Sequence, residues 1–136
     1  MMNAETVDED SRRTPIPTVM VVEDEVLIRV IIAEYLRDCG FLVVEASNGD
    51  QALSLLAHAD KEFDIVFTDV HMPGSTNGLQ LAQWIERERP EIEVILTSGL
   101  ARKADAAKDL CGHRQLVEKP YDLSDVEQRI RRLLKR

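Results

Sequence analysis

The chain has 136 residues, 44% of them hydrophobic, which is enough to bury the core of one domain of ordinary size. Its formal net charge of −8 works against a nucleic-acid partner, because such binding rests on the neutralisation of phosphates by Lys and Arg. The polar, acidic N-terminus is no signal peptide, and no apolar stretch approaches the roughly 18 residues of a membrane-spanning helix, so we expect a cytoplasmic protein.

Residues 1–15 are dense in Asp, Glu and Arg and poor in apolar side chains, so we expect them to form a disordered tail. The remaining residues, 16–136, are expected to form one domain. Cys39 and Cys111 stand in no metal-ligand or redox spacing, and we expect both to be reduced thiols.

After the tail, apolar runs alternate with segments of helical character. The predicted strands, in chain order, are Val19–Val22, Phe41–Ala46, Phe63–Thr68, Ile92–Leu96 and Arg114–Val117. The predicted helices are Glu25–Asp38, Asn48–Ala59, Gly78–Arg89, Ala101–Leu110 and Asp122–Leu134. The first helix contains the stretch Val26–Ile32, which is apolar on most sides, so a strand is the alternative there. Strands that alternate with helices predict βαβ units and an α/β fold with a parallel sheet.

Four of the predicted strands are followed by a short island of polar residues. The islands are Glu23-Asp24, Asp69, Thr97-Ser98 and Lys119-Pro120. Ligands of an open parallel sheet bind beyond the carboxyl ends of its strands, so we expect the islands to meet there. Two carboxylates 4 Å apart repel by about 4 kcal/mol at an effective dielectric constant of about 20, so three of them need a counter-charge. Mg²⁺ prefers oxygen ligands and can supply that charge, together with the ammonium of Lys119.

This set of groups predicts phosphoryl chemistry on an aspartate. A carboxylate can attack phosphorus and form an acyl phosphate. We predict that Asp69 is this nucleophile and that Mg²⁺, the Lys119 ammonium and the Thr97 hydroxyl hold the phosphoryl oxygens. Each residue alone has an ordinary interpretation, as a turn aspartate, a strand-end hydroxyl or a surface lysine, and the prediction depends on their combination. The peptide bond before Pro120 could be cis or trans.

The islands resemble the receiver domain of two-component response regulators. The matching motifs, in order over residues 17–136, are Glu23-Asp24, Asp69 with Met72-Pro73, Thr97-Ser98-Gly99 and Lys119-Pro120. The resemblance implies a flavodoxin-like (βα)5 fold, in which a doubly wound parallel sheet has the strand order 2-1-3-4-5. The receiver domain would then cover residues 16–136.

The resemblance also implies a role for each matching residue. Asp69 would be the phosphoacceptor, and Thr97 and Lys119 would contact the phosphoryl group. Glu23, Asp24 and Asp69 would bind Mg²⁺ through their carboxylates, and His71 would bind it through its backbone carbonyl. The phosphoryl donor would be a phosphohistidine on a sensor histidine kinase or a histidine phosphotransfer protein.

The sequence departs from the family pattern at three places. The first acid is Glu23 where many members have Asp, and the loop from Met72 to Gly78 is one residue longer than the common pattern. Leu116 occupies the position where many members carry a switching Tyr or Phe, so we expect the usual aromatic switch to be absent. Tyr121 is a candidate for part of that role at the surface.

These features predict a stand-alone phosphorylation-dependent switch that signals by protein–protein interaction, with no output domain after Arg136. A phosphorylation-dependent homodimer, formed through the fourth helix, the fifth strand and the fifth helix, is one arrangement for that interaction. The alternative is a phosphate shuttle or sink in a phosphorelay. In either case the chain would catalyse only its own phosphotransfer and autodephosphorylation. A Mg²⁺-dependent phosphatase is disfavoured, because His71 stands where such enzymes commonly place a second acid.

Overall fold

The computed structural model describes residues 16–58, 61–99 and 115–135. The strands of this part form one parallel sheet in the order β2-β1-β3-β4-β5, which confirms the predicted fold. They are β1 (Thr18–Val22), β2 (Leu42–Ala46), β3 (Ile65–Asp69), β4 (Glu93–Ser98) and β5 (Gln115–Glu118). The helices are α2 (Val26–Asp38), α3 (Gly49–Leu56), α4 (Gly78–Glu88) and α6 (Leu123–Leu134).

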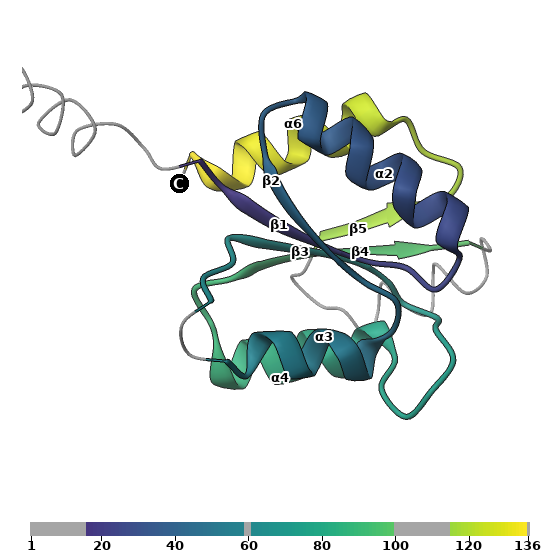
Figure 1. Ribbon diagram of the computed structural model, residues 1–136, viewed down its shortest axis with the longest axis vertical. Helices are drawn as coiled ribbons and strands as arrows, with labels where there is room; N and C mark the ends of the chain where they lie inside the picture. The colour runs from purple at the N-terminus through teal and green to yellow at the C-terminus, as the bar shows by residue number, and fades with distance from the viewer. Residues whose placement is uncertain (1–15, 59–60, 100–114, 136) are drawn as a thin grey trace, which may run out of the picture.

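The helices form two layers, with α2 and α6 on one face of the sheet and α3 and α4 on the other (Figure 1). The interior strand β1, between β2 and β3, divides its side chains between the two layers, because successive residues of a strand point to opposite faces. Val19 and Val21 pack in the cluster on the side of α2 and α6, and Met20 and Val22 in the cluster on the side of α3 and α4. A strand buried on both faces reads as a continuous apolar run, which is why the sequence of β1 lacks alternation.

The segment for which a strand was the alternative is the helix α2. Its inner face buries Ile32, Ala33 and Leu36, while Leu27 is 77% exposed and Ile31 is 59% exposed. The outer side of this helix is therefore unusually apolar, which explains the poor helical phasing of its sequence.

Two of the helices begin at asparagine side chains that cap their first turns. The Asn48 side chain accepts a hydrogen bond from the backbone of Gln51, and Asn77 forms a reciprocal capping box with Gln80. Asp122 is the N-cap residue of α6, but its side chain makes no capping bond. Within the described residues, the structure contains no helix long and apolar enough to span a bilayer. The predicted tail 1–15, the predicted helix Ala101–Leu110 and Cys111 lie outside the described residues.

Candidate functional site

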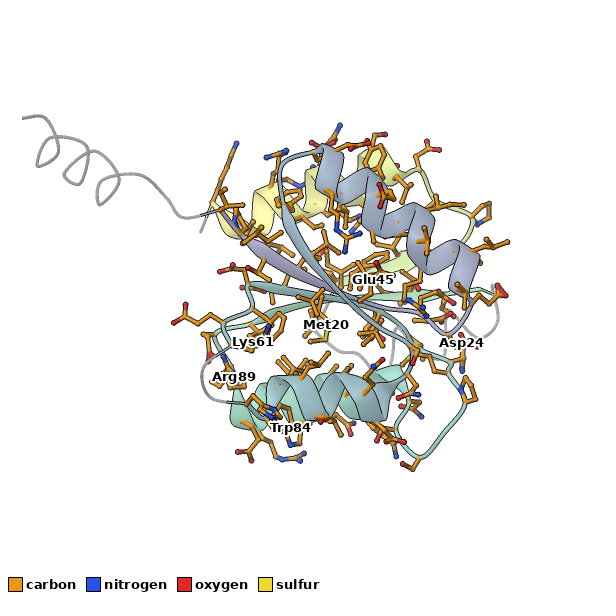
Figure 2. The ribbon with its side chains drawn as sticks, viewed as in Figure 1. Met20, Asp24, Glu45, Lys61, Trp84 and Arg89 are labelled. Atoms are coloured by element: carbon orange, nitrogen blue, oxygen red, sulfur yellow. The ribbon has the colours of Figure 1, made fainter. Side chains whose placement is uncertain are left out.

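The carboxyl ends of four strands bring the predicted polar islands to one edge of the sheet. The parallel register pairs Val22 of β1 with Thr68 of β3, and Asp69 with Thr97 of β4. It also pairs Ser98 with Glu118 of β5, the residue before Lys119. In Figure 2, Asp24 lies at the end of the sheet where Figure 1 draws the arrowheads of β4 and β5, and Arg89 lies at the other end.

Two carboxylates face one ammonium at this edge. The Lys119 ammonium donates a hydrogen bond of 2.8 Å to Oδ2 of Asp69 and lies 4.0 Å from Oε1 of Glu23. The side chains of Glu23 and Asp69 are only 5% and 12% exposed, and that of Lys119 is 27% exposed. Little water screens these charges, so the lysine is the counter-charge that the gathered acids require.

Burial and charge shift the pKa values of this cluster. Burial raises the pKa of Glu23, and the charge of Asp69 adds to the rise, against a backbone hydrogen bond from Glu25 and the charge of Lys119. Burial acts to lower the pKa of Lys119, but the hydrogen bond and charge of Asp69 and the charge of Glu23 outweigh it, so that pKa is raised. Lys119 is therefore a cation at neutral pH.

Backbone groups hold the Asp69 carboxylate from its other side. The N–H of His71 donates to Oδ1 of Asp69 at 3.1 Å, while Lys119 occupies Oδ2. The N–H of Gly78 donates to the carbonyl of Val70 at 2.9 Å, and a Cβ at position 78 would overlap the Asp69 carbonyl. The chain therefore needs glycine where α4 begins, because the helix start approaches the strand end so closely.

The remaining predicted residues surround this carboxylate at different depths. Thr97 is buried, and its carbonyl accepts a hydrogen bond of 2.8 Å from the N–H of Val70. Asp24 follows the buried Glu23 in the chain and is exposed. His71 is exposed beside Asp69. All of the predicted site residues thus gather at this edge of the sheet.

The donor atoms at the edge are of the kind that Mg²⁺ takes. No group of three or more Asp, Glu, His or Cys side chains in the described ranges stands close enough to enclose a metal ion. Mg²⁺ needs no such cage, since it commonly binds one or two carboxylates and keeps several waters. The carboxylates of Glu23 and Asp69 both face the Lys119 ammonium, so two oxygen ligands lie on one side of the site. The residues present are therefore compatible with Mg²⁺.

Two more residues support the site: Arg29, which sequence reasoning missed, and Tyr121, which it considered only for a role at the surface. Nη1 of Arg29 donates to the Glu23 carbonyl at 3.0 Å, and its Nε bonds Glu45 on β2 at 3.1 Å. Tyr121 is half-buried, and its ring packs edge-on against Phe67 at 5.9 Å. Burial, with the charges of Glu23 and Asp69, raises the pKa of Tyr121 to about 12. An arginine in an otherwise apolar run was the available signal for the first contact, and nothing in the sequence indicated the second.

Two other positions can be compared with expectation. Leu116 lies on β5 opposite Leu96 and packs with the small cluster of Val70, Ala82 and Leu96. The peptide bond between Lys119 and Pro120 is cis, one of the two alternatives left open by the sequence.

Comparison with known proteins then decides the family. The family model for the response regulator receiver domain matches residues 19–131. The chain belongs to this family. Receiver domains are signalling domains that sensor histidine kinases phosphorylate, and membership of this family supports a phosphorylation-dependent switch.

Similar proteins agree with this assignment. The transcriptional regulatory protein AruR of Pseudomonas aeruginosa is 33% identical over 125 residues, which are 89% of this chain and 50% of AruR. A receiver protein of Sinorhizobium medicae is 25% identical with a TM-score of 0.79, covering 89% of this chain and 96% of that one. TrrA of Thermotoga maritima, solved with Mg²⁺ and BeF, is 25% identical with a TM-score of 0.73, covering 87% of this chain and 99% of that one. The chain spans about half the length of the curated relatives it matches.

Proposed function

We propose that this receiver domain accepts a phosphoryl group on Asp69 in a Mg²⁺-dependent reaction, and that the donor is a phosphohistidine of a sensor kinase or a histidine phosphotransfer protein. The observation that carries the proposal is the pairing of Asp69 with Lys119 beside the buried Glu23. A carboxylate oxygen of Asp69 forms a bond to phosphorus as the bond from phosphorus to the donor imidazole breaks, and the electron pair of that bond stays on the imidazole.

The residues at the edge have distinct parts in this reaction. Glu23, Asp24, Asp69 and the His71 carbonyl would hold Mg²⁺, which neutralises charge on the transferring group. Lys119 already contacts Asp69, so its ammonium needs only a short movement to reach a phosphoryl oxygen. Thr97, opposite Asp69 in the register, would donate its hydroxyl to another oxygen. The same groups would support autodephosphorylation.

We propose that the phosphorylated domain signals by binding another protein. Phosphorylation adds about −1.5 to −2 charges at Asp69 and so competes for Lys119. A switch from 1:99 to 99:1 requires this event to favour the active state by about 5.5 kcal/mol. Because several relatives are named as transcriptional regulators, our expectation of no nucleic-acid partner applies to this stretch of chain alone. The homodimer and the stand-alone form stay predictions, as does the cytoplasmic location.

The proposal is tested by incubating the protein with acetyl phosphate and Mg²⁺ and measuring its intact mass. We expect a gain of one phosphoryl group that disappears on chelation of Mg²⁺ and in the variant Asp69→Asn. Profiling against the histidine kinases of the host would then identify the donor. A wild-type protein that takes no phosphoryl group from either source would overturn the proposal.

The alternative role, a phosphate shuttle or sink, is separated by a binding experiment. A pull-down from the host's lysate, with phosphorylated wild type and with Asp69→Asn, should give a partner only with the phosphorylated protein if the domain is a switch. A phosphoryl group that passes to a histidine phosphotransfer protein, with no phosphorylation-dependent partner, would favour the shuttle.

A further inference from the structure

The loop between β3 and α4, residues 70–77, is tied by side chains to the first turn of α3. Both carboxylate oxygens of Asp50 accept hydrogen bonds from the Ser75 hydroxyl, at 2.8 and 2.9 Å. The Thr76 hydroxyl donates to Oδ1 of the same carboxylate at 2.7 Å. These bonds stabilise the ionised carboxylate and lower the pKa of Asp50.

The backbone of the loop is equally close to α3. A Cβ on Gly49 would overlap the carbonyl of Thr76, so the first residue of α3 is pressed against the loop. Gly74 has φ of +105°, a conformation that favours glycine, and the loop reverses there to present Ser75 and Thr76 to Asp50. Residues of the loop and residues of α3 therefore both shape this contact.

From this contact, further contacts continue into the phosphorylation site. Asn77, which follows Thr76, caps α4 through Gln80, and Gly78 contacts the carbonyls of Val70 and Asp69. At the other end of the same loop, the N–H of His71 donates to the Asp69 carboxylate. A displacement of the loop from α3 would thus move a group that orients the phosphoacceptor.

We propose that Asp50 is a positioning residue for phosphoryl transfer to Asp69, because its carboxylate holds the loop in the conformation in which His71 orients that aspartate. This inference rests on the proposed function of the domain. The ordinary role of an acid in a first helical turn is to complement the helix dipole. That role does not account for the two hydroxyls of the loop, and Asn48 already caps α3.

The test compares two ways of breaking the same contact. Asp50→Ala removes the carboxylate, and the double variant Ser75→Ala with Thr76→Val removes its partners while leaving the acid on α3. We expect each to slow phosphorylation by acetyl phosphate and Mg²⁺ about tenfold, since small misplacements of reacting groups cost rate steeply. We expect the triple variant, which combines these substitutions, to be no slower than Asp50→Ala or the double variant. Each of the three proteins lacks the same contact, so the effects should not add. Asp125→Ala is the matched control, an acid in the first turn of α6, and should keep the wild-type rate.

A second measurement needs no phosphoryl chemistry. Amide hydrogen exchange of His71 and of residues 75–77 should be faster in both Asp50→Ala and the double variant, with exchange in β1 and β4 unchanged. Wild-type exchange and rates in both variants would overturn the inference alone. Slower phosphorylation together with faster exchange throughout the sheet would overturn it as well, because Asp50 would then act only through global stability. A wild-type chain that is never phosphorylated would overturn the proposed function and the role of Asp50 with it.

Discussion

Ser98 places a hydroxyl in the core without a hydrogen-bond partner among the described residues. Ser98 is the last residue of β4 and is 1% exposed. Its carbonyl accepts a hydrogen bond of 2.9 Å from the N–H of Lys119. A buried polar atom that loses its hydrogen bonds to water and gains none in the protein lowers the stability of the fold by roughly 1–3 kcal/mol. If unpaired in the folded protein, this hydroxyl would destabilise the strand end, whereas the backbone of Ser98 holds Lys119 in place.

We expect Ser98→Ala to raise the free energy of unfolding by about 1 kcal/mol, because it removes the unpaired hydroxyl and little volume. Urea denaturation monitored by circular dichroism measures this change. A loss of stability of similar size would mean that the hydroxyl has a partner in the folded protein.

Residue by residue, the chemistry-bearing side chains were predictable and their supports were not. Asp69 and Lys119 stand at the ends of apolar strands, so the parallel sheet alone brings them to one edge. The 2.8 Å contact between them also requires the Lys119 side chain to reach past β4, which lies between β3 and β5. The bond from Arg29 to the Glu23 carbonyl and the packing of Tyr121 on Phe67 depend on side-chain directions that no periodicity encodes.

At the scale of the elements, α2 shows how tertiary packing overrides a confusing local pattern. Its seven-residue apolar stretch suits a strand as well as a helix, yet the buried side chains Ile32, Ala33 and Leu36 recur at helical spacing against the sheet. The structure resolves the ambiguity because the remaining apolar side chains face solvent, which sequence patterning alone would not suggest.

This division of α2 predicts opposite outcomes for two leucines. Leu36 is fully buried, so Leu36→Ala should cost about 2–5 kcal/mol of stability through lost contacts and a cavity. Leu27 is 77% exposed, so Leu27→Gln should change stability by less than about 0.5 kcal/mol. Chemical denaturation of the two variants, side by side, checks the pair. A large effect at Leu27 would mean that the outer side of the helix is covered in solution.

Glu127 of α6 links this helix to α2. This carboxylate accepts a hydrogen bond of 2.9 Å from Arg131 and one of 3.4 Å from the Tyr35 hydroxyl on α2. The bond from Arg131 is the main cause that lowers the pKa of Glu127 below 4.5, with further bonds from Cys39 and Tyr35.

A carboxyl with a lowered pKa in the folded state stabilises the protein above its unfolded pKa, and the contribution is lost as the pH falls through the folded value. We therefore expect Glu127→Gln to melt below the wild type at pH 7, and the difference to vanish as the pH falls below 4.5 and through the lowered pKa of Glu127. Thermal melts across this range, with Glu34→Gln on α2 as the exposed control, measure the effect. A difference that is the same at every pH would rule out the charge of Glu127 as its cause.

For the whole molecule, the order and direction of the strands could be predicted because β and α patterns alternate and the chain resembles a known family. Most ends of the elements shifted by one or two residues, as with β3, which runs to Asp69 itself, whereas α3 ends at Leu56, three residues before the predicted end. The seat of the loop 70–77 on α3 was not predictable, since it depends on hydroxyls at Ser75 and Thr76 that read as ordinary loop residues.

Contacts from both helical layers converge on the side chain of Asp69. Asp69 is contacted by Lys119, which lies between β5 and α6, and by the loop that rests on α3 and leads into α4. The neighbouring Glu23 is connected to α2, because its carbonyl accepts a hydrogen bond from Arg29. A phosphoryl group on Asp69, as proposed, would lie against groups connected to both helical layers. We therefore expect phosphorylation to affect both faces of the sheet and not one alone.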